Sequence, residues 1–383
     1  MVEHLKYKVA IVHNTIAPYR HPLFEKLSQN LDLIVYYCSV KHGLRHWALW
    51  PRNYDYKYKI LPRISIGEFC VNPSIIKELA ANMPQILLLG GYVDPTMWLS
   101  FAIGKFFNIP IIYWTEAVKE PQSILGAITR PLRILFTIKS DAIVVPGRLS
   151  KNYVISLGAD LEKIFVAVNS IDNRLFIDLL DKYRSQKEEL KAQLGFEGKV
   201  VILYVGQLIK RKGLEYLLYA YAKLKQENNE AALVLLGSGS LEHYLRDLAS
   251  SLGLRDFKII HAGLNLEELV KLYLAADIFA LPTLEDIWGF VINEALVCGL
   301  PVVATRASQA AQEMIRDGEN GYIVKEADSE HLYNALKNLI HDSEHREKMG
   351  EKSMEIVVRE FDVLHTVNGF LSAIKYCTKG IQK

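Results

Sequence analysis

The sequence predicts an α/β protein with two doubly wound parallel sheets, each in its own domain, and three observations support this. Short apolar runs of strand length alternate with helical segments along the whole chain, as in parallel sheets covered on both faces. The 383 residues are enough for two sizeable cores. A polar turn followed by a charged helical stretch interrupts the alternation near residue 173, which places the domain boundary there.

The first half of the chain holds six apolar runs with the length of buried strands. They cover residues 8–13, 33–38, 85–90, 110–114, 142–146 and 164–168. The most apolar stretch, 97–114, resembles a membrane span but is interrupted by Lys105, Asn108 and Pro110. A helix to about residue 107 and a buried strand after it explain this stretch better.

The second half holds six further runs of the same kind. They cover residues 200–206, 231–237, 257–263, 278–282, 301–305 and 321–324. A long amphipathic stretch, about 330–377, closes the chain, with breaks near His341 and Phe361. We therefore predict an N-terminal domain over residues 1–172 and a C-terminal domain over residues 173–361.

Composition and charge exclude several classes of protein. The chain is 50% hydrophobic and 23% charged, as in ordinary globular proteins, and its net charge of +2 is too small to indicate nucleic-acid binding. The first residues lack the apolar core and cleavage site of a signal peptide. The cysteines are far apart and form no CxxC pair, so neither zinc nor disulfides are expected, and the cytoplasm is the expected compartment. These cysteines are Cys38, Cys70, Cys298 and Cys377.

The stretch LPTLEDIWGFVINEALVCGLPVVAT, residues 281–305, places two carboxylates in an apolar setting. The spacing of its apolar residues predicts a helix that begins near Gly289 and ends at Gly299. This helix begins at the carboxyl end of a parallel strand, where ligands bind in open α/β sheets. Its N-terminus favours an anion such as phosphate, and Gly289 permits close approach of a ligand.

Asp286 would then lie just before the helix, and Glu294 about one turn inside it. Because carboxylates repel phosphate, we expect them to accept hydrogen bonds from sugar hydroxyls at two ends of one ligand. The structural alternative makes Asp286 a helix N-cap and places Glu294 on a solvated face. The residues alone leave both interpretations open.

The same stretch resembles the acid-x7-acid element of retaining glycosyltransferases of the GT-B fold, in particular family 4. The family's usual first acid is Glu, whereas Asp286 holds this position here; Glu285 would give a spacing of eight residues. The resemblance, which extends over nearly the whole chain, implies two Rossmann-like domains facing each other across a cleft. It also implies that Asp286 binds the donor sugar and Glu294 the ribose of a nucleotide diphosphate sugar. We further expect a C-terminal helix, about 362–383, to pack back on the first domain.

Two more segments match the family at strand ends. In VGQLIKRKG, residues 205–213, Lys212-Gly213 match, but Gln207 replaces the family's Arg. The implied role of Lys212 is to neutralise the donor diphosphate, with Arg211 or Lys210 as the missing cation. The structural alternative is a solvated basic turn.

In LVLLGSGS, residues 233–240, Gly237 and Gly239 are implied to line the donor site, although tight turns also require glycine. The segment is neither a Walker A loop nor a full GxGxxG fingerprint, which disfavours nicotinamide cofactors. Five further positions are implied to bind the donor. They are Gly206, Ile287, Trp288, Gly289 and Phe290.

The first domain offers candidates for the acceptor. His13, Asn14 and Arg20 follow the first strand and are candidate acceptor or phosphate contacts, with a purely structural role as the alternative for His13. At a later strand end, Thr115-Glu116 replaces the family's His. We expect Glu116 to polarise the acceptor hydroxyl, with a helix-start acid as the alternative.

The resemblance implies a retaining, hexosyltransferase-type enzyme that acts in glycan, glycolipid or polysaccharide biosynthesis. No cofactor or metal is expected, because no Asp-x-Asp signature lies at a strand end. The acceptor would be a glycan or a lipid-linked molecule. An epimerase of the same fold and a non-catalytic sugar-nucleotide-binding subunit remain open as other functions.

A basic amphipathic segment, residues 123–139, carries Arg130, Arg133 and Lys139 among apolar residues. Such a helix can rest on an anionic bilayer, which would bring the protein to the inner face of the membrane. A core-facing helix with solvated basic residues is the favoured interpretation.

Overall fold

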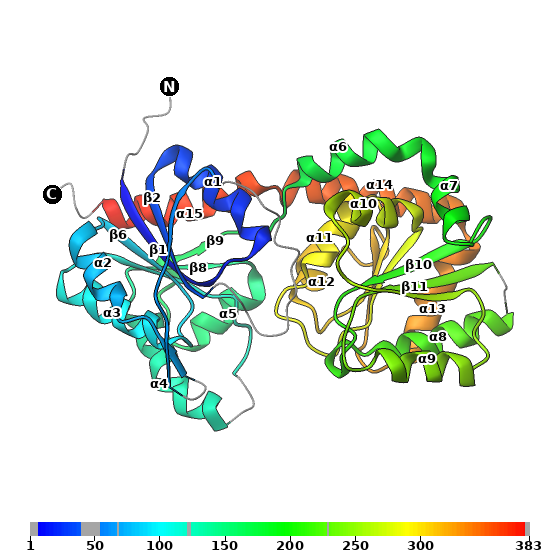
Figure 1. Ribbon diagram of the computed structural model, residues 1–383, viewed down its shortest axis with the longest axis horizontal. Coiled ribbons are helices and arrows are strands. Elements are labelled where there is room, and N and C mark those ends of the chain that lie inside the picture. Colours follow the sequence, from blue (N-terminus) through cyan, green and yellow to red (C-terminus); the bar gives the residue numbers. More distant parts are fainter. Residues whose placement is uncertain (1–6, 40–53, 67–68, 121–123, 228–229, 380–383) are drawn as a thin grey trace. The chain divides into compact units, whose positions relative to one another are not determined.

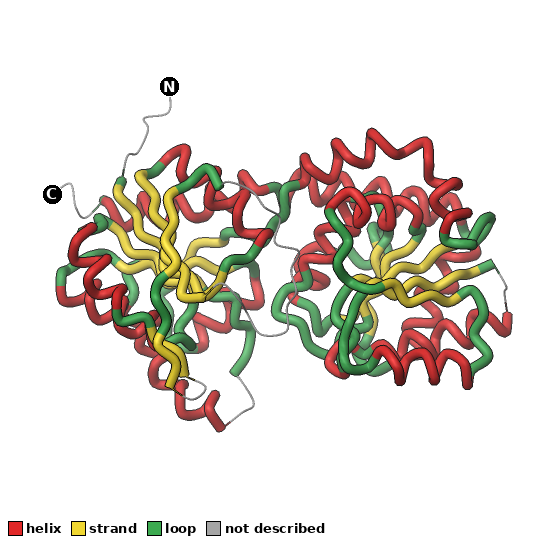
Figure 2. The backbone as a smooth tube through the Cα atoms, in the orientation of Figure 1, coloured by secondary structure: helices red, strands yellow, loops and turns green. Residues whose placement is uncertain are grey.

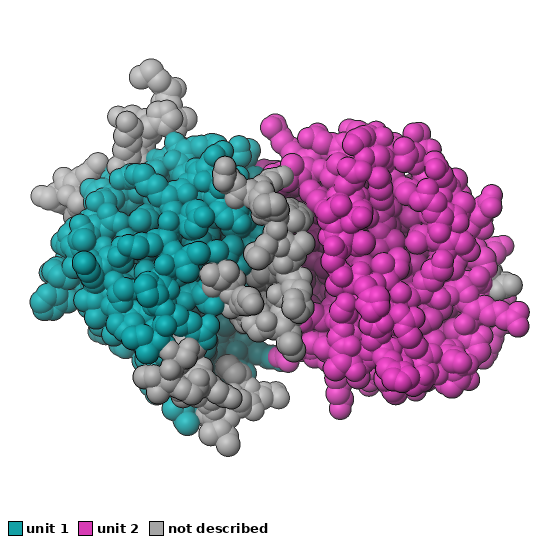
Figure 3. All heavy atoms as spheres, in the orientation of Figure 1, with its two compact units in different colours: residues 1–169, 363–383 teal, residues 170–362 magenta. Residues whose placement is uncertain are grey.

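The structure is a computed structural model that describes residues 7–39, 54–66, 69–120, 124–227 and 230–379. The chain forms two compact units (Figure 3), one of Met1–Asn169 with Val363–Lys383 and one of Ser170–Asp362. The predicted boundary near residue 173 falls just inside the second unit. Residues 1–6, on which the signal-peptide argument partly rests, lie outside the described residues, as do residue 123 of the basic segment and residues 380–383 of the C-terminal helix.

The first unit is built on a parallel sheet of seven strands in the order β3-β2-β1-β6-β7-β8-β9 (Figure 1). Its strands are β1 (Lys8–Thr15), β2 (Asp32–Ser39), β3 (Lys57–Ile60), β6 (Ile86–Gly90), β7 (Ile111–Trp114), β8 (Ala142–Val145) and β9 (Ile164–Val166). A separate antiparallel pair consists of β4 (Ile64–Ile66) and β5 (Phe69–Val71). Strands β3, β4 and β5 are absent from the prediction.

Helices cover both faces of this sheet, as Figure 2 shows. They are α1 (His21–Asn30), α2 (Ser74–Asn82), α3 (Pro95–Phe106), α4 (Ile124–Lys139), α5 (Arg148–Ser156) and α15 (Val363–Thr378), with the short 3-10 helices η1 (Pro18–Arg20) and η2 (Leu161–Lys163). Alternate residues of β1 enter two cores: Val9 and Ile11 pack with α1 and α15, whereas Ala10 and Val12 pack with α2, α3 and α4. This alternation is the period of a strand buried on both faces.

The second unit has a parallel sheet of six strands in the order β12-β11-β10-β13-β14-β15. The strands are β10 (Val200–Val205), β11 (Ala231–Leu236), β12 (Phe257–Ile260), β13 (Ile278–Leu281), β14 (Val302–Thr305) and β15 (Gly321–Val324). The helices are α6 (Asn173–Tyr183), α7 (Lys187–Gln193), α8 (Leu214–Glu227), α9 (Glu242–Ser251), α10 (Leu266–Ala275), α11 (Phe290–Val297), α12 (Gln309–Met314), α13 (Ser329–His341) and α14 (Ser343–Glu360), with the 3-10 helices η3 (Arg184–Gln186) and η4 (Lys210–Lys212).

Both sheets are doubly wound, which confirms the predicted fold class. In each, the strand order reverses between two central neighbours: β1 and β6 in the first unit, and β10 and β13 in the second. The crevice at the carboxyl ends of such strands is the usual ligand site of open α/β sheets. The loops after β10 and β13 are therefore the first place to look for a site.

The apolar stretch 97–114 folds as predicted, with α3 ending at Phe106 and β7 beginning at Ile111. Within the described ranges, no helix combines the length and apolar content that a membrane crossing requires.

Helix α4 differs from the favoured interpretation of a core-facing helix with solvated basic residues. Arg133 is only 1% exposed, whereas Ile128 is 68% exposed. The arginine can turn inward because its guanidinium forms an ion pair with Glu120 and donates a hydrogen bond to the hydroxyl of Tyr92. A buried charge needs such partners.

Candidate functional site

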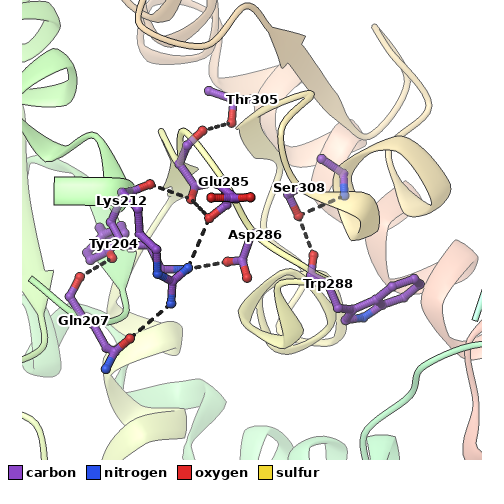
Figure 4. A network of polar contacts seen from close by, with 11 residues as sticks. Tyr204, Gln207, Lys212, Glu285, Asp286, Trp288, Thr305 and Ser308 are labelled. Carbon is purple, nitrogen blue, oxygen red and sulfur yellow. Dashed lines mark hydrogen bonds and ion pairs between the residues drawn. The ribbon is translucent and has the colours of Figure 1, made fainter. Parts of the chain in front are cut away.

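The loops that follow β10 and β13 bring Lys212 and Asp286 together (Figure 4). The ammonium of Lys212, the last residue of η4, forms an ion pair with Oδ2 of Asp286, which lies between β13 and α11. Lys212 is only 7% exposed. The alternative of a solvated basic turn is therefore wrong, because this lysine is buried against a carboxylate.

Hydrogen bonds to main-chain oxygens hold these two loops against each other. The amide of Leu284 donates to the main-chain oxygen of Arg211 at 2.8 Å, and Nη1 of Arg211 donates to the main-chain oxygen of Glu285 at 3.1 Å. Gly213 has a φ of 61°, and a Cβ there would lie 2.4 Å from the main-chain oxygen of Pro282. The close approach of the loops therefore requires glycine at position 213.

Gln207, which stands where the family has Arg, holds a neighbouring arginine. Its Oε1 accepts a hydrogen bond from Nη2 of Arg211 at 3.2 Å, and its main-chain oxygen accepts from the hydroxyl of Tyr204 at 2.9 Å. Burial, with a smaller contribution from the charge of Asp286, raises the pKa of Tyr204 well above its usual range. The tyrosine therefore stays protonated and fixes the loop as a hydrogen-bond donor.

The glycines after β10 and β11 let their loops pack closely. A Cβ on Gly237 would lie 1.8 Å from the main-chain oxygen of Gly206, and one on Gly239 would lie 2.4 Å from that of Leu208. Loop packing thus requires glycine at 237 and 239 whether or not a ligand is present. A role of Gly206, Gly237 and Gly239 in lining the donor site stays a prediction.

Helix α11 begins directly after Gly289, as predicted. Gly289 is its N-cap residue with a φ of 99°, and no side chain caps the helix. The alternative of Asp286 as N-cap is therefore wrong. A Cβ on Gly289 would lie 2.8 Å from Oγ of Ser308, so the left-handed backbone and the close serine both require glycine.

The residues next to Gly289 have different surroundings. The indole of Trp288 is 2% exposed, donates to Oδ1 of Asn293 at 3.0 Å and points away from Lys212 (Figure 4). This geometry makes the indole a core side chain, and a donor contact by Trp288 stays a prediction. Ile287 is 57% exposed and Phe290 is half-buried, and donor contacts by these two residues stay predictions.

Glu294 lies in the second turn of α11 and faces α10. Its Oε2 accepts a hydrogen bond from the hydroxyl of Tyr273 at 2.7 Å. Burial raises the pKa of Glu294 to about 7. The half-buried position and the hydrogen bond from Tyr273 disfavour the alternative of a solvated acid. In the described part of the chain no lysine or arginine forms an ion pair with this carboxyl group, whose side-chain partner is the hydroxyl of Tyr273.

The raised pKa predicts a pH-dependent stability. Because the folded-state pKa of Glu294 exceeds the unfolded value of 4.5, its protonated form stabilises the fold below pH 4.5, and this contribution is lost as the pH rises through about 7. The Glu294→Gln variant has no carboxyl group to ionise at this position, so it does not lose stability in this way as the pH rises. We expect the difference in unfolding free energy, variant minus wild type, to increase by about 3 kcal/mol between pH 4.5 and pH 8. Urea unfolding at several pH values measures this gain, and parallel curves for the two proteins would contradict it.

In the first unit, the structure brings Arg20 and Glu116 together. Arg20 is 4% exposed and forms an ion pair with Oε1 of Glu116, and its Nη1 donates to Oδ1 of Asn169 at 2.8 Å. Nδ2 of Asn169 donates to the same Glu116 oxygen at 3.2 Å. Glu116 follows β7 and α4 begins only at Ile124, so the alternative of a helix-start acid is wrong. Catalytic and acceptor roles for this pair stay predictions.

His13 is buried in the first unit. It is 7% exposed, its Nδ1 lies 2.9 Å from the main-chain oxygen of Thr15, and its ring lies 5.4 Å from that of Trp114. This burial favours the structural alternative for His13. Asn14, which is half-buried, remains a predicted acceptor contact.

The sequence analysis did not identify two residues that form hydrogen bonds with the candidate site residues. Tyr273 lies among buried apolar residues of α10, and Asn169 lies in the polar turn that was read only as a boundary. A tyrosine on the apolar face of a helix is a usable signal, because a buried hydroxyl needs a partner. Across the described ranges, no group of three His, Cys, Asp or Glu side chains is placed to hold a metal ion.

Known structures define the class of fold. The crystal structure of the Anabaena protein HepE in complex with UDP and glucose matches with a TM-score of 0.77 at 18% sequence identity, covering 96% of this chain and 99% of that one. The two doubly wound units are thus the Rossmann-like domains of the GT-B fold.

Sequence comparison then gives the family. The model of glycosyl transferases group 1 matches residues 186–355. A D-inositol 3-phosphate glycosyltransferase of Xylanimonas cellulosilytica is 30% identical over 74% of this chain and 71% of its own length. The chain therefore belongs to the glycosyl transferases group 1. It is also 26% identical to the sulfoquinovosyl transferase of Arabidopsis thaliana over 74% of this chain, but the match spans only 55% of that relative's length.

Proposed function

We propose that this protein transfers a sugar from a nucleotide diphosphate sugar to a hydroxyl of a glycan or lipid-linked acceptor, with retention of configuration, as a family 4 enzyme. The observation that supports this best is the buried Lys212–Asp286 pair between β10 and β13, with Glu294 in the second turn of α11. It combines a cation for phosphate and two carboxyl groups for hydroxyls. HepE, seen with UDP and with UDP-glucose, supports a nucleotide-sugar donor.

On this proposal, donor binding exchanges partners at Lys212. The donor diphosphate takes the ammonium from Asp286, which frees the carboxylate to accept hydrogen bonds from sugar hydroxyls. Arg211, held by Gln207, supplies the second cation in preference to the exposed Lys210. Both cations act where charge develops as the diphosphate leaves, so they stabilise the transition state more than the bound donor.

The first unit would hold the acceptor. Glu116, oriented by Arg20 and Asn169, would accept a hydrogen bond from the acceptor hydroxyl. The bond from the anomeric carbon to the diphosphate oxygen breaks, a bond to the acceptor oxygen forms on the same face, and the departing phosphate takes the proton. We place this reaction at the cytoplasmic side, in the synthesis of a glycan, glycolipid or polysaccharide.

A donor panel tests the function. Thermal unfolding with UDP-glucose, GDP-mannose and related donors identifies the nucleotide that stabilises the protein. Product analysis by NMR with simple sugar acceptors then shows the anomeric configuration. An inverted product would contradict retention. Conversion of the donor without an acceptor would make the protein an epimerase, and stabilisation without any turnover would make it a binding subunit.

Removal of metal ions tests whether protein side chains or a bound metal ion neutralise the charge of the diphosphate. Because Lys212 and Arg211 supply the positive charge on this proposal, we expect transfer to persist in excess EDTA. The transfer rate with and without chelator is the measurement. Complete loss with EDTA, restored by Mg²⁺ or Mn²⁺, would show that a metal ion performs this role.

A further inference from the structure

Helix α4 of the first unit carries an apolar stripe on its exposed surface. Ile128, Leu135 and Ile138 are 68%, 41% and 46% exposed, and Pro131 between them is also exposed. Positions 128, 131, 135 and 138 follow the spacing of one helix face. Single exposed apolar residues are ordinary, but a row along one helix marks an interaction surface.

The orientation of the helix about its axis is fixed from the inside. Nη1 of Arg133 donates to the hydroxyl of Tyr92 at 2.9 Å, and Nη2 forms an ion pair with Oε2 of Glu120, which lies outside the helix. Phe136 stacks on Phe101 of α3 at 4.4 Å between ring centroids. Turning the stripe inward would break these contacts and leave a buried charge unpaired, so the stripe stays at the surface.

Basic side chains accompany the stripe on α4 and on α5, the next helix along the chain. Helices α4 and α5 contain no Asp or Glu, and Arg130, Lys139 and Arg148 on them are exposed, whereas Arg133 is buried; Glu120 forms ion pairs with both Arg130 and Arg133. The two helices are close at the end of the stripe, because a Cβ on Gly158, just after α5, would lie 3.5 Å from Cδ1 of Ile138. An apolar row bordered by cations is complementary to the acyl chains and anionic headgroups of a bilayer.

We propose that the exposed face of α4 docks on an anionic membrane surface, with Ile128, Leu135 and Ile138 inserted among the lipids and Lys139 at the headgroups. This surface belongs to the first unit, whereas the donor-binding residues of the proposed function belong to the second. The proposal rests on the proposed function only for its purpose, which is to bring the enzyme to a lipid-linked acceptor.

Vesicle sedimentation with the full chain tests the docking. We expect the wild type to pellet with vesicles of phosphatidylcholine containing about one third phosphatidylglycerol at low ionic strength, and to stay in solution with phosphatidylcholine alone. Ile128→Ser/Leu135→Ser/Ile138→Ser should lower the partition coefficient at least tenfold, because each serine removes apolar surface that enters the bilayer. Lys139→Gln should lower it roughly fivefold.

A matched control changes three exposed aliphatic residues on other elements. Ile60→Ser/Ile76→Ser/Val358→Ser removes side chains that are 43%, 47% and 44% exposed, and should partition like the wild type. Equal binding by the stripe variant and the wild type would overturn the proposal, as would absence of wild-type binding to the anionic vesicles. A dimer that the stripe substitutions dissociate, without vesicle binding, would identify a second copy as the partner instead.

The same variants separate docking from catalysis. The stripe variant should bind the nucleotide diphosphate and transfer to a water-soluble acceptor as the wild type does. Lys212→Ala should bind vesicles normally while it loses affinity for the nucleotide. If no nucleotide sugar binds at all, the proposed function fails, but the vesicle result still decides the docking.

Discussion

Lys212→Ala should weaken the binding of a nucleotide diphosphate by roughly 1.5–3 kcal/mol, the range for hydrogen bonds to charged groups. This corresponds to a loss of affinity from about tenfold to more than a hundredfold. The reason is that Lys212 is a cation in the loop after β10, beside the loop after β13, where the proposed function requires the diphosphate to bind. Isothermal titration with UDP and GDP measures the effect.

The ion pair with Asp286 makes a second variant informative. Because the carboxylate of Asp286 competes with phosphate for Lys212, Asp286→Asn should raise the affinity for the free nucleotide diphosphate. The same substitution should lower transfer, because the sugar loses a charged acceptor. Lys212→Ala also leaves Asp286 without this partner, so thermal unfolding must show that the variant is folded. Equal affinity of Lys212→Ala and wild type for the nucleotide would contradict the assignment.

The elements of this fold that could be predicted are those with a clear pattern of apolar residues over a short stretch of sequence. The buried strands of both sheets are continuous apolar runs, and α11 is bounded by Gly289 and Gly299, so its limits could be read directly. Strand β3 escaped because all four of its residues are exposed and give no alternation. Strands β4 and β5 have three residues each, too few for a period.

The pairing of the site residues could not be predicted in the same way. Lys212 and Asp286 lie 74 residues apart, and their contact exists only because β10 and β13 are neighbours at the reversal of the strand order. Likewise, Arg20 and Glu116 lie 96 residues apart. Sequence patterns placed each residue at a strand end but carried no information on which ends meet. The resemblance to a family identified the candidates, and the strand order then brought them into contact.

Asp286→Asn and Glu294→Gln should each lower the rate of sugar transfer by about tenfold or more, equivalent to roughly 1.4 kcal/mol of transition-state stabilisation. Each substitution keeps the shape of the side chain and replaces one carboxyl oxygen, which can accept hydrogen bonds from hydroxyls, with an NH2 group, which can only donate. For Glu294, the hydrogen bond from Tyr273 can persist to the amide oxygen of Gln, so the loss reports on the ligand. Initial rates at saturating donor, compared with thermal unfolding, measure the effect.

Glu285 is the matched control, because it carries the same charge one residue away. Its side chain is exposed, and its main-chain oxygen, not its carboxylate, receives Nη1 of Arg211. Neighbouring residues in an extended segment point to opposite sides, so Glu285→Gln should leave transfer nearly unchanged. Asp286→Glu, which restores the family's usual acid, should retain measurable activity, since the longer carboxylate still reaches the space between Lys212 and α11. If Glu285→Gln abolished transfer while Asp286→Asn left it intact, the sugar-binding acid would be Glu285, and the register of the acid pair would shift by one residue.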